Sequence, residues 1–559
     1  MEHCLLEHHL WYLQGKAYNR YKKIMEPLFA KKNVIFYSLL ISTLIIASFF
    51  LFYNLDDRYL WKDEAETALL AKSILSEGIP KSKIGQNTIH IHLDSYLRSD
   101  GVWTYHPWLQ FYITALSFKL FGPSTVSARM PFALIGFLSL LALFWFTFQL
   151  TNKREIALLS VIFLTFSVPF VLHMRECRYY APTVFFTILL LMSYVSFLKH
   201  QRYSGFLVLL FSNLLFHSNY AAFIPVNCAL ILHYFLFFRK DEWFKKFIIL
   251  QVLIFITTFP WFLYLNGFQH THKLLTWKEL RHNIAFYFRS TYKFMYPFIC
   301  FAILEIYFYI RKKSLVLCSS FNLLKKEYFW LLSFVFMFTY LIAFIGEQRY
   351  FRYIIFLMPI YAIFLGLNFY SLFKFNKKIA GFICILVLST NLLHYNLPIF
   401  FLKQFKPLLD SKILPEKLMN KINNTHFMPL KEYVYELTHP FLDSDKEIVN
   451  FFQKNAKVGD SIGIPYGDHT LMFYTDFKIV NMMFYKNSFP DWIVLQRPWF
   501  EDVYGNVDES PYFAEIEKHY EKIQTDIPDV RWSHRPDPSS MSFRDNKTSL
   551  KLAIYKKKS

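Results

Sequence analysis

Charged residues are scarce in this chain. They make up 18% of its 559 residues, against about 25% in ordinary soluble proteins. Hydrophobic residues make up 54% of the chain, and they gather into runs of about 20, the length that crosses a lipid bilayer. This composition excludes an ordinary soluble enzyme of several domains. It indicates an integral membrane protein with a soluble appendage.

Cysteine is also rare, and the positions of the cysteines indicate neither a disulfide framework nor a metal site. The six cysteines show no paired spacing and no CxxC motif, and none follows Cys384. These absences exclude a disulfide framework in the C-terminal part and a zinc site built from cysteine pairs. We expect no cleavable signal peptide, because a polar and basic segment, 1–32, precedes the first apolar run and no small-residue cleavage site follows it. That run is interpreted as a signal anchor.

The excess positive charge is confined to the first 400 residues. The formal net charge is +20, and from Phe401 onward 22 basic residues balance 22 acidic ones. The excess lies mainly in short loops between apolar runs, which is typical of loops retained on the cytoplasmic side of a membrane. No basic tract with interleaved aromatic residues indicates nucleic acid as a partner.

The apolar runs predict about eleven membrane spans. The first covers 33–53, and the basic pair Lys31-Lys32 before it places the N-terminal segment in the cytoplasm. A polar stretch, 54–130, is too charged to span and forms a large first outer loop. The other spans are expected at 131–150, 156–173, 182–198, 204–220, 221–238, 247–265, 294–310, 328–346, 353–373 and 379–401. An odd number of spans places the C-terminus on the non-cytoplasmic side.

The predicted fold is a polytopic α-helical membrane domain, 33–401, followed by a soluble non-cytoplasmic domain, 402–559. In the soluble domain a helix is expected from Asp443, where an acidic start precedes helical apolar spacing. Short β-like runs occur at 461–465, 492–495 and 552–555. Together these elements predict a small α/β domain. Its GDSIG segment, Gly459 to Gly463, lacks the glycine pattern of a dinucleotide site, so no cofactor is expected.

Three carboxylates lie within four residues shortly after the first span. Asp63, Glu64 and Glu66 border a stretch, 65–76, with the apolar spacing of a helix. On that helix Asp63 and Glu66 share one face and Glu64 points elsewhere. Carboxylates at a membrane boundary are partly desolvated, which raises their basicity and suits a general base. The alternative is a solvated acidic turn that caps an interfacial helix, and an acidic cluster alone favours this alternative.

Several arginines approach the same face of the membrane as this acidic loop. They are Arg129, Arg175, Arg178, Arg349 and Arg352. Charged residues at such depth are costly unless they are paired or functional, and arginine suits phosphate through its bidentate fork. Each arginine alone is better explained as a lipid-headgroup anchor or an ion-pair partner. Together with the acidic loop, they indicate a site with a base on one side and a phosphate clamp on the other.

Histidines in the outer loops allow a metal site as an alternative. His90, His92 and Asp94 alternate as on one face of a strand, a spacing that could hold a metal. A short exposed hairpin strand explains them better, and the same alternatives apply to His270 and His272. A divalent metal is therefore possible, but none is predicted.

The motifs resemble those of the GT-C superfamily of membrane glycosyltransferases, above all the protein O-mannosyltransferases and the aminoarabinose transferases of lipid A. The resemblance covers the chain to about residue 370, and the C-terminal domain corresponds by position only. The matching features are Asp63-Glu64 after the first span, His106-Pro107 before an apolar segment that ends in Ala128-Arg129-Met130-Pro131, Arg175-x-x-Arg178-Tyr179-Tyr180, and Arg352-Tyr353 with Pro359.

The resemblance implies an inverting transfer of a sugar from a polyprenyl-phosphate carrier to an acceptor hydroxyl, at the non-cytoplasmic face of a plasma membrane. Asp63 would be the general base, and Glu64 would help to orient donor or acceptor. The residues expected at the donor phosphate are His106, Arg175, Arg178, Arg349 and Arg352. Further substrate contacts are expected from Glu66, Tyr105, Trp108, Arg129, Tyr179 and Tyr353.

The chain departs from the aminoarabinose transferases at two positions. Glu66-Thr67 stands where they carry an Arg-Tyr pair, and Trp108 stands where they carry a second proline. Both positions lie near the expected donor site, so the identity of the sugar is not inferred. Glu66 also leaves open which carboxylate is the base.

The chemistry expected from these residues needs no metal. A lipid phosphate is a good leaving group, so the reaction requires an activated hydroxyl and positive charge near the departing phosphate. The acceptor can be a protein Ser or Thr, lipid A, a cell-wall glycan or a glycolipid. A transporter or flippase of lipid-linked sugars is the alternative function, but transporters tend to show internal repeats and midplane sites, and neither is seen in the sequence. A non-catalytic scaffold would not explain the acidic loop.

Overall fold

The computed structural model describes residues 31–90, 98–264, 275–312, 315–347, 349–390, 393, 428–531 and 550–558. The chain forms two compact units, Met1–Phe49 and Phe50–Ser559. The described part of the first unit is one apolar helix, α2 (Lys31–Phe52), which runs on into the start of the second unit. His92, Asp94, His270 and His272 lie outside the described residues, so the alternative of a histidine metal site stays a sequence-based possibility there.

Seven helices in the described part of the chain are long and apolar enough to cross a membrane. They are α2, α5 (Thr125–Thr151), α8 (Tyr180–Leu198), α10 (Tyr220–Phe237), α11 (Phe244–Tyr264), α14 (Lys326–Ile345), and α15 (Met358–Phe375) with the 3-10 helix η4 (Phe351–Leu357) before it. The number rises to nine if each of two bent helix pairs crosses as one span. The protein is therefore an integral membrane protein, as its composition predicts.

Every predicted span coincides with a helix, but four of the eleven are broken or short. The region 156–173 forms α6 (Arg154–Thr165) and α7 (Val168–Met174), which are bent by 71°, and 294–310 falls on α13 (Phe298–Lys312), bent by 67° from α12 (Trp277–Phe294). The regions 204–220 and 379–401 contain the shorter helices α9 (Ser204–Ser218) and α16 (Lys377–Ser389). Proline has no backbone N–H to continue the hydrogen bonds of a helix, and Pro169 stands at the start of α7, where the helix breaks. The residues on both sides of the break are apolar, so a prediction from hydrophobicity alone treats them as one span.

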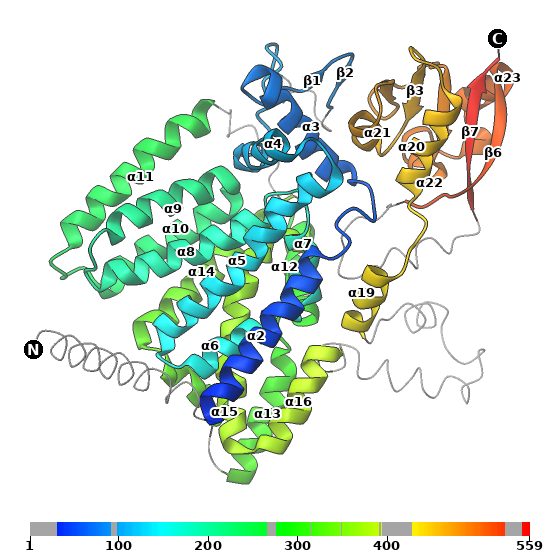
Figure 1. Ribbon diagram of the computed structural model, residues 1–559. Helices are drawn as coiled ribbons and strands as arrows, with labels where there is room; N and C mark the ends of the chain where they lie inside the picture. The colour runs from blue at the N-terminus through cyan, green and yellow to red at the C-terminus, as the bar shows by residue number, and fades with distance from the viewer. Residues whose placement is uncertain are drawn as a thin grey trace, which may run out of the picture. The chain divides into compact units, whose positions relative to one another are not determined.

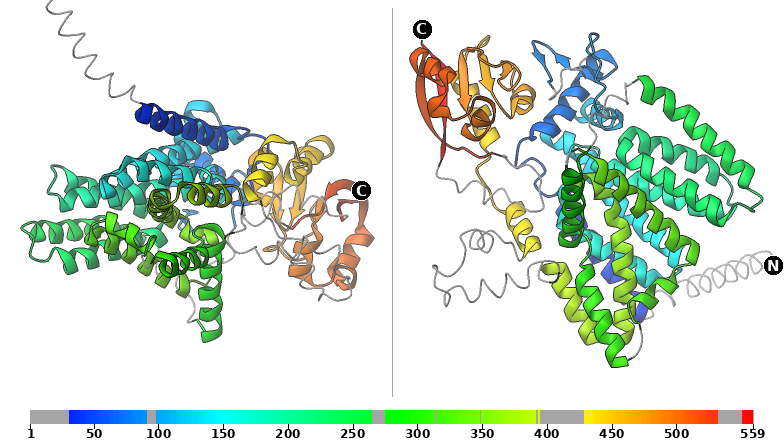
Figure 2. Two further views of the ribbon diagram at one scale, coloured as in Figure 1. Left: turned by 90° about the horizontal axis from the view of Figure 1, so that it is seen from below. Right: turned by 180° about the vertical axis from the view of Figure 1, so that it is seen from behind.

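The membrane helices pack closely around small residues. Helices α8, α9, α10 and α11 lie side by side, and α10 also contacts α14 (Figures 1 and 2). Helix α15 packs on α6 at Gly366, where a Cβ atom would lie 2.5 Å from Ser160 Oγ and 2.9 Å from the carbonyl oxygen of Ile156. The approach of these two helices thus depends on the absence of a side chain at Gly366.

The first loop after α2 folds into helices and one short hairpin. Helix α3 (Lys62–Glu77) confirms the helix expected over 65–76, and it ends at Gly78, whose left-handed backbone (φ +77°) terminates the ladder. Strands β1 (Lys83–Ile84) and β2 (Asn87–Thr88) form the hairpin, and α4 (Leu109–Phe121) is the apolar segment before α5. Helix α3 contacts α4 and, in the C-terminal region, α21 (Asp468–Tyr474).

The C-terminal region contains a small α/β domain, as expected. Its sheet has the order β4-β3-β5-β7-β6, in which β3 pairs in parallel with β4 and β5, whereas β7 is antiparallel to β5 and β6. The strands are β3 (Ser461–Ile464), β4 (Lys478–Asn481), β5 (Trp492–Leu495), β6 (Tyr520–Pro528) and β7 (Lys551–Lys557). The helices are α19 (Pro429–Thr438), α20 (Ser444–Asn455), α21 (Asp468–Tyr474), α22 (Arg497–Tyr504) and α23 (Pro511–His519).

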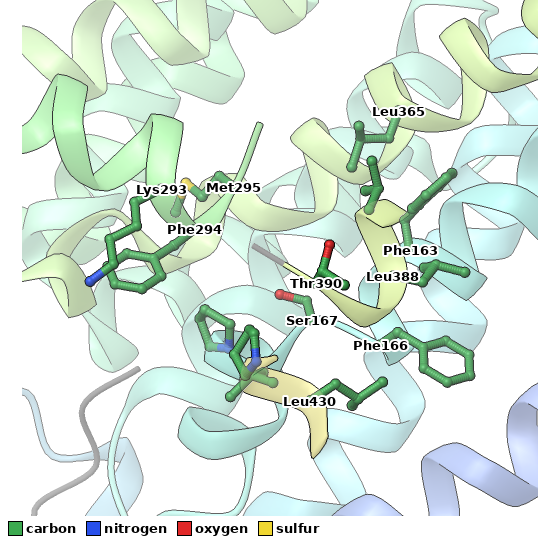
Figure 3. A pocket seen from close by; sticks show the side chains of 14 residues that line it. Phe163, Phe166, Ser167, Lys293, Phe294, Met295, Leu365, Leu388, Thr390 and Leu430 are labelled. Atoms are coloured by element: carbon green, nitrogen blue, oxygen red, sulfur yellow. The ribbon is translucent and has the colours of Figure 1, made fainter. Parts of the chain in front are cut away.

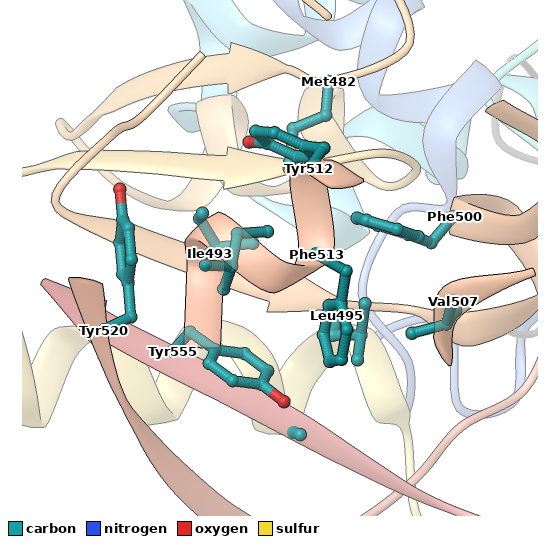
Figure 4. Close-up of a cluster of buried hydrophobic side chains, with 11 residues drawn as sticks. Met482, Ile493, Leu495, Phe500, Val507, Tyr512, Phe513, Tyr520 and Tyr555 are labelled. Atoms are coloured by element: carbon teal, nitrogen blue, oxygen red, sulfur yellow. The ribbon is translucent and has the colours of Figure 1, made fainter. Parts of the chain in front are cut away.

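The three predicted strands and the helix after Asp443 are confirmed. The Asp443 side chain caps α20 by accepting hydrogen bonds from the backbone amides of Asp445 and Lys446. Strands β4 and β6 lie at the two edges of the sheet, and edge strands carry polar side chains that weaken the strand pattern in a sequence. An apolar cluster that includes Ile493 and Phe500 packs α22 and α23 against the sheet (Figure 4).

Candidate active site

A cavity of about 180 Å³ lies at the first turn of α3, and we call it the α3 cavity. Its walls come from α3, the loop before α4, the loop between α7 and α8, η4, and the C-terminal domain. Eight of the thirteen predicted site residues line it: Asp63, Glu66, Tyr105, His106, Arg178, Tyr179, Arg352 and Tyr353. Motifs that are far apart in the chain therefore meet in one place.

Asp63 is the carboxylate that remains open to the cavity. Its side chain is 24% exposed, and its Oδ2 atom lies 3.2 Å from Arg352 Nη1 and 3.8 Å from Arg178 Nη2. Asp63 and Glu66 share the cavity side of α3, whereas Glu64 does not line the cavity, which is the distribution that the helical spacing predicts. Asp63 therefore contacts the Arg352 guanidinium directly, lies near that of Arg178, and keeps part of its side chain exposed to the cavity.

Glu66, His106 and Arg178 form a buried cluster beside Asp63. Glu66 Oε1 accepts a hydrogen bond from Arg178 Nη1 at 2.9 Å and lies 3.2 Å from His106 Nδ1. Burial alone would raise the pKa of Glu66, but the charges of His106 and Arg178 outweigh it and hold that pKa far below its usual value. Burial lowers the pKa of His106 below 6.5. His106 Nε2 lies 3.4 Å from Arg178 Nη2.

Glu64 and Arg129 pair with each other away from the cavity. Arg129 donates through Nε and Nη2 to the two carboxylate oxygens of Glu64, at 2.9 and 2.6 Å. Glu64 also accepts from the backbone amide of Cys177 at 2.9 Å, and Arg129 donates to the carbonyl oxygens of Leu55 and Arg58. This buried bidentate pair joins α3, α5 and the loop after α7. Neither residue is placed to contact a substrate in the α3 cavity.

Three further predicted residues lie outside the cavity lining. Arg175 donates to the backbone carbonyl oxygens of Phe50 and Tyr53 at 2.9 and 2.7 Å, so it anchors the chain that leaves α2. Trp108 is buried, and its indole N–H donates to the carbonyl oxygen of Trp103 at 2.8 Å. Arg349 is exposed to solvent. Of the two neighbouring arginines, Arg352 is the one that faces Asp63.

The C-terminal domain supplies cavity residues that the sequence did not single out. Asp468 at the start of α21 is fully buried and lies 3.0 Å from Lys62 Nζ, and the Lys62 ammonium lies over the Tyr466 ring at 5.0 Å. Burial would raise the pKa of Asp468, but His469 and Lys62 lower it below its usual value. The polar Asp468-His469 pair that begins an otherwise mostly apolar helix was the available sequence signal.

Glu176 is a buried carboxyl group that the motifs also left unassigned. It precedes Cys177 in the loop after α7 and is 4% exposed. Burial, assisted by the charge of Glu64, raises its pKa well above the usual value. Burial therefore disfavours a negative charge on Glu176.

A second, smaller pocket of about 70 Å³ lies at the breaks in both bent helix pairs (Figure 3). Its lining is mainly apolar, with Lys293, Ser167 and Thr390 as the polar side chains. It contains no carboxylate or guanidinium group, so it lacks the acid–base groups that line the α3 cavity. Among the described residues, no three His, Cys, Asp or Glu side chains come together in a way that could hold a metal ion.

The buried pair of Glu64 and Arg129 predicts a stability effect. Glu64→Gln should lower the free energy of unfolding by about 3–5 kcal/mol, because it leaves the Arg129 charge buried without a partner. Thermal unfolding in detergent measures this. Glu77→Gln, at the exposed end of α3, where Glu77 pairs with Lys81, is the matched control and should cost less than about 1 kcal/mol. Equal melting temperatures for the two variants would contradict a structural role of Glu64.

Comparisons with known proteins agree with these motifs. Residues 105–264 match the family described as dolichyl-phosphate-mannose-protein mannosyltransferase. A protein from Aquifex aeolicus (strain VF5), described as uncharacterized, is 24% identical over 216 residues, which cover 38% of this chain and 41% of that protein. The chain thus aligns with less than half the length of that relative.

The fold is similar to that of ArnT from Cupriavidus metallidurans. The crystal structure of ArnT bound to undecaprenyl phosphate matches with a TM-score of 0.52 and 12% identity, over 94% of this chain and 98% of ArnT. The apo structure of ArnT matches with a TM-score of 0.51 and 13% identity, over 84% of this chain and 93% of ArnT. The chain therefore has the same fold as ArnT over most of its length, as the resemblance of its motifs implies.

Proposed function

We propose that the protein is an inverting glycosyltransferase, which moves a sugar from a polyprenyl-phosphate carrier to an acceptor hydroxyl at the non-cytoplasmic face of the membrane. The observation that carries this proposal is the α3 cavity, where the accessible carboxylate of Asp63 faces the guanidinium groups of Arg352 and Arg178. A base and a phosphate clamp on facing walls are the two parts that the reaction needs.

The donor phosphate is proposed to lie against Arg352 and Arg178. The Nε atoms of both arginines are buried and have no hydrogen-bond partner among the described residues. Unsatisfied buried donors are costly, and phosphate oxygens would satisfy them while the guanidinium charges stabilise the phosphate that departs. His106 Nε2, beside Arg178, would complete this side of the site. Positive charge for the leaving group is thus available without a metal ion.

Asp63 is proposed as the general base. The acceptor oxygen would form a bond to the anomeric carbon as the bond from that carbon to the phosphate oxygen breaks, and the hydroxyl proton would pass to Asp63. Attack from the side opposite the phosphate inverts the anomeric configuration. Without substrate, Arg352 holds Asp63 at 3.2 Å. A donor phosphate on Arg352 would take over this charge and make the Asp63 carboxylate more basic.

Glu66 is a weaker candidate for the base. Its carboxylate is already bound by Arg178 and lies against His106, and its lowered pKa makes it a poor proton acceptor. We propose instead that Glu66 positions Arg178 and His106 for the phosphate. Tyr105, Tyr179 and Tyr353, which also line the cavity, are proposed to surround the substrate.

Replacement of the proposed base should reduce the rate of sugar transfer without unfolding the protein. Asp63→Asn should reduce the rate of sugar transfer by about 10²–10⁴-fold, because an amide accepts no proton. The measurement is the release of free undecaprenyl phosphate from sugar-bearing carrier by protein in membrane vesicles. Asp56→Asn, at an exposed site seven residues earlier, is the matched control and should keep the wild-type rate. Transfer by Asp63→Asn at the wild-type rate would remove Asp63 from this role.

Two neighbouring arginines give a test of the phosphate clamp. Arg352→Gln should weaken the binding of undecaprenyl phosphate about 10–100-fold, because it removes a charge-assisted hydrogen bond to phosphate. Arg349→Gln, an exposed arginine three residues away, should leave this affinity within about twofold. Titration of the purified protein with undecaprenyl phosphate measures both. Equal losses in the two variants, or no loss in Arg352→Gln, would contradict the proposed clamp.

A further inference from the structure

The C-terminal domain places a buried histidine in the wall of the α3 cavity. His469 is the second residue of α21, is 1% exposed, and lines the cavity. Neither of its ring nitrogens has a hydrogen-bond partner among the described residues, and its Nε2 lies 3.5 Å from Asp468 Oδ2. A buried polar side chain of this kind is costly to keep unless something else satisfies it.

His469 is held in this position by contacts between α21 and the start of α3. Thr470 donates a hydrogen bond to the carbonyl oxygen of Leu60 at 2.9 Å, and Asp468 lies 3.0 Å from Lys62 Nζ. His469 is also close enough to Glu66 to contribute to the lowered pKa of that carboxyl group. The imidazole therefore belongs to the same cavity as Asp63, but it enters from the C-terminal domain.

The orientation of a bound donor determines which part of the donor His469 can contact. The prenyl chain must remain in the bilayer, and Arg352 stands at the start of a helix that is long and apolar enough to span it. A phosphate bound to Arg352 would therefore have the lipid on the membrane side and the sugar on the other side. The C-terminal domain forms that other side through α21. The sugar would thus extend toward His469.

The chemistry of imidazole fits a sugar hydroxyl. A neutral imidazole has one N–H donor and one nitrogen acceptor, and a hydroxyl group can both accept and donate. Phosphate oxygens offer acceptors only, and their match is the pair of guanidinium groups of Arg352 and Arg178. A site that is built to hydrogen-bond a hydroxyl discriminates strongly against a ligand that lacks it.

We propose that His469 hydrogen-bonds a hydroxyl group of the sugar on the polyprenyl-phosphate donor, so that the C-terminal domain selects the sugar that is transferred. This inference rests on the proposed function, since it takes the ligand of the α3 cavity to be a sugar-bearing lipid phosphate. His469 is then a specificity-determining residue, and Arg352 binds the part that all such donors share.

The test compares carriers with and without a sugar. The probes are undecaprenyl phosphate and undecaprenyl phosphate that carries mannose, glucose, galactose or aminoarabinose, titrated against the purified full chain. The wild type should bind at least one sugar-bearing carrier at least about tenfold more tightly than undecaprenyl phosphate, a difference of about 1.4 kcal/mol. His469→Ala should lose this preference and bind undecaprenyl phosphate within twofold of the wild type. His469→Gln, whose amide can donate and accept, should retain part of the preference.

The controls separate this inference from the proposed function and from a structural effect. His519→Ala, an exposed histidine in the same domain, should change neither affinity. A His469→Ala variant that keeps the preference, or that loses affinity for undecaprenyl phosphate to the same extent, would overturn the proposal, as would a wild type with no preference for any sugar. Failure of the proposed function would appear differently, as an Arg352→Gln variant that binds undecaprenyl phosphate like the wild type.

Discussion

The site depends on how three carboxylates near the start of α3 are divided among three arginines. Asp63 faces Arg352, Glu64 binds Arg129, and Glu66 binds Arg178. The arginines come from η4, α5 and the loop before α8, so each pair ties a different part of the membrane domain to α3. Buried charges are costly unless they are paired, and this constraint leaves few other arrangements for α3. The position of the cavity follows from these pairings.

The three pairs differ in burial, and this difference separates structure from chemistry. The pair of Glu64 and Arg129 is bidentate and closed off, with a side-chain exposure of 1% for Glu64. Glu66 is engaged by Arg178 and His106, whereas Asp63 keeps 24% of its side chain exposed to the cavity. A carboxylate that is both partly desolvated and accessible is suited to accept a proton. Three similar residues within four positions thus have three different environments.

The spacing of residues in the sequence predicted much of this arrangement. It could not predict which residue each side chain pairs with. Helical periodicity separated Glu64 from Asp63 and Glu66, and the motifs gathered Arg178, Arg352 and His106 correctly into the cavity. Periodicity cannot decide which arginine meets which carboxylate, because that choice is made by tertiary packing. Arg175 and Arg129 were therefore grouped with the phosphate clamp. In the structure, Arg175 donates to a backbone carbonyl oxygen and Arg129 donates to Glu64.

The same limit applies to the parts that the sequence left open. The breaks between α6 and α7 and between α12 and α13 have apolar residues on both sides. A hydropathy average over the region therefore does not detect them. Strand β6 carries mostly polar side chains and strand β4 has only four residues, so neither shows a clear alternation in the sequence. The contribution of His469 and Lys62 arises from the docking of α21 on α3, a contact between segments some 400 residues apart. No local pattern encodes such a contact.

A structure of the protein with bound undecaprenyl phosphate tests the central claim most directly. We expect phosphate oxygens within hydrogen-bond distance of Arg352 and Arg178, with His106 beside them and the lipid chain directed into the bilayer. We also expect the distance from Asp63 to Arg352 to become longer than the 3.2 Å found here. A phosphate bound at Arg349, or in the apolar pocket beside Lys293, with Asp63 still paired to Arg352, would contradict the account.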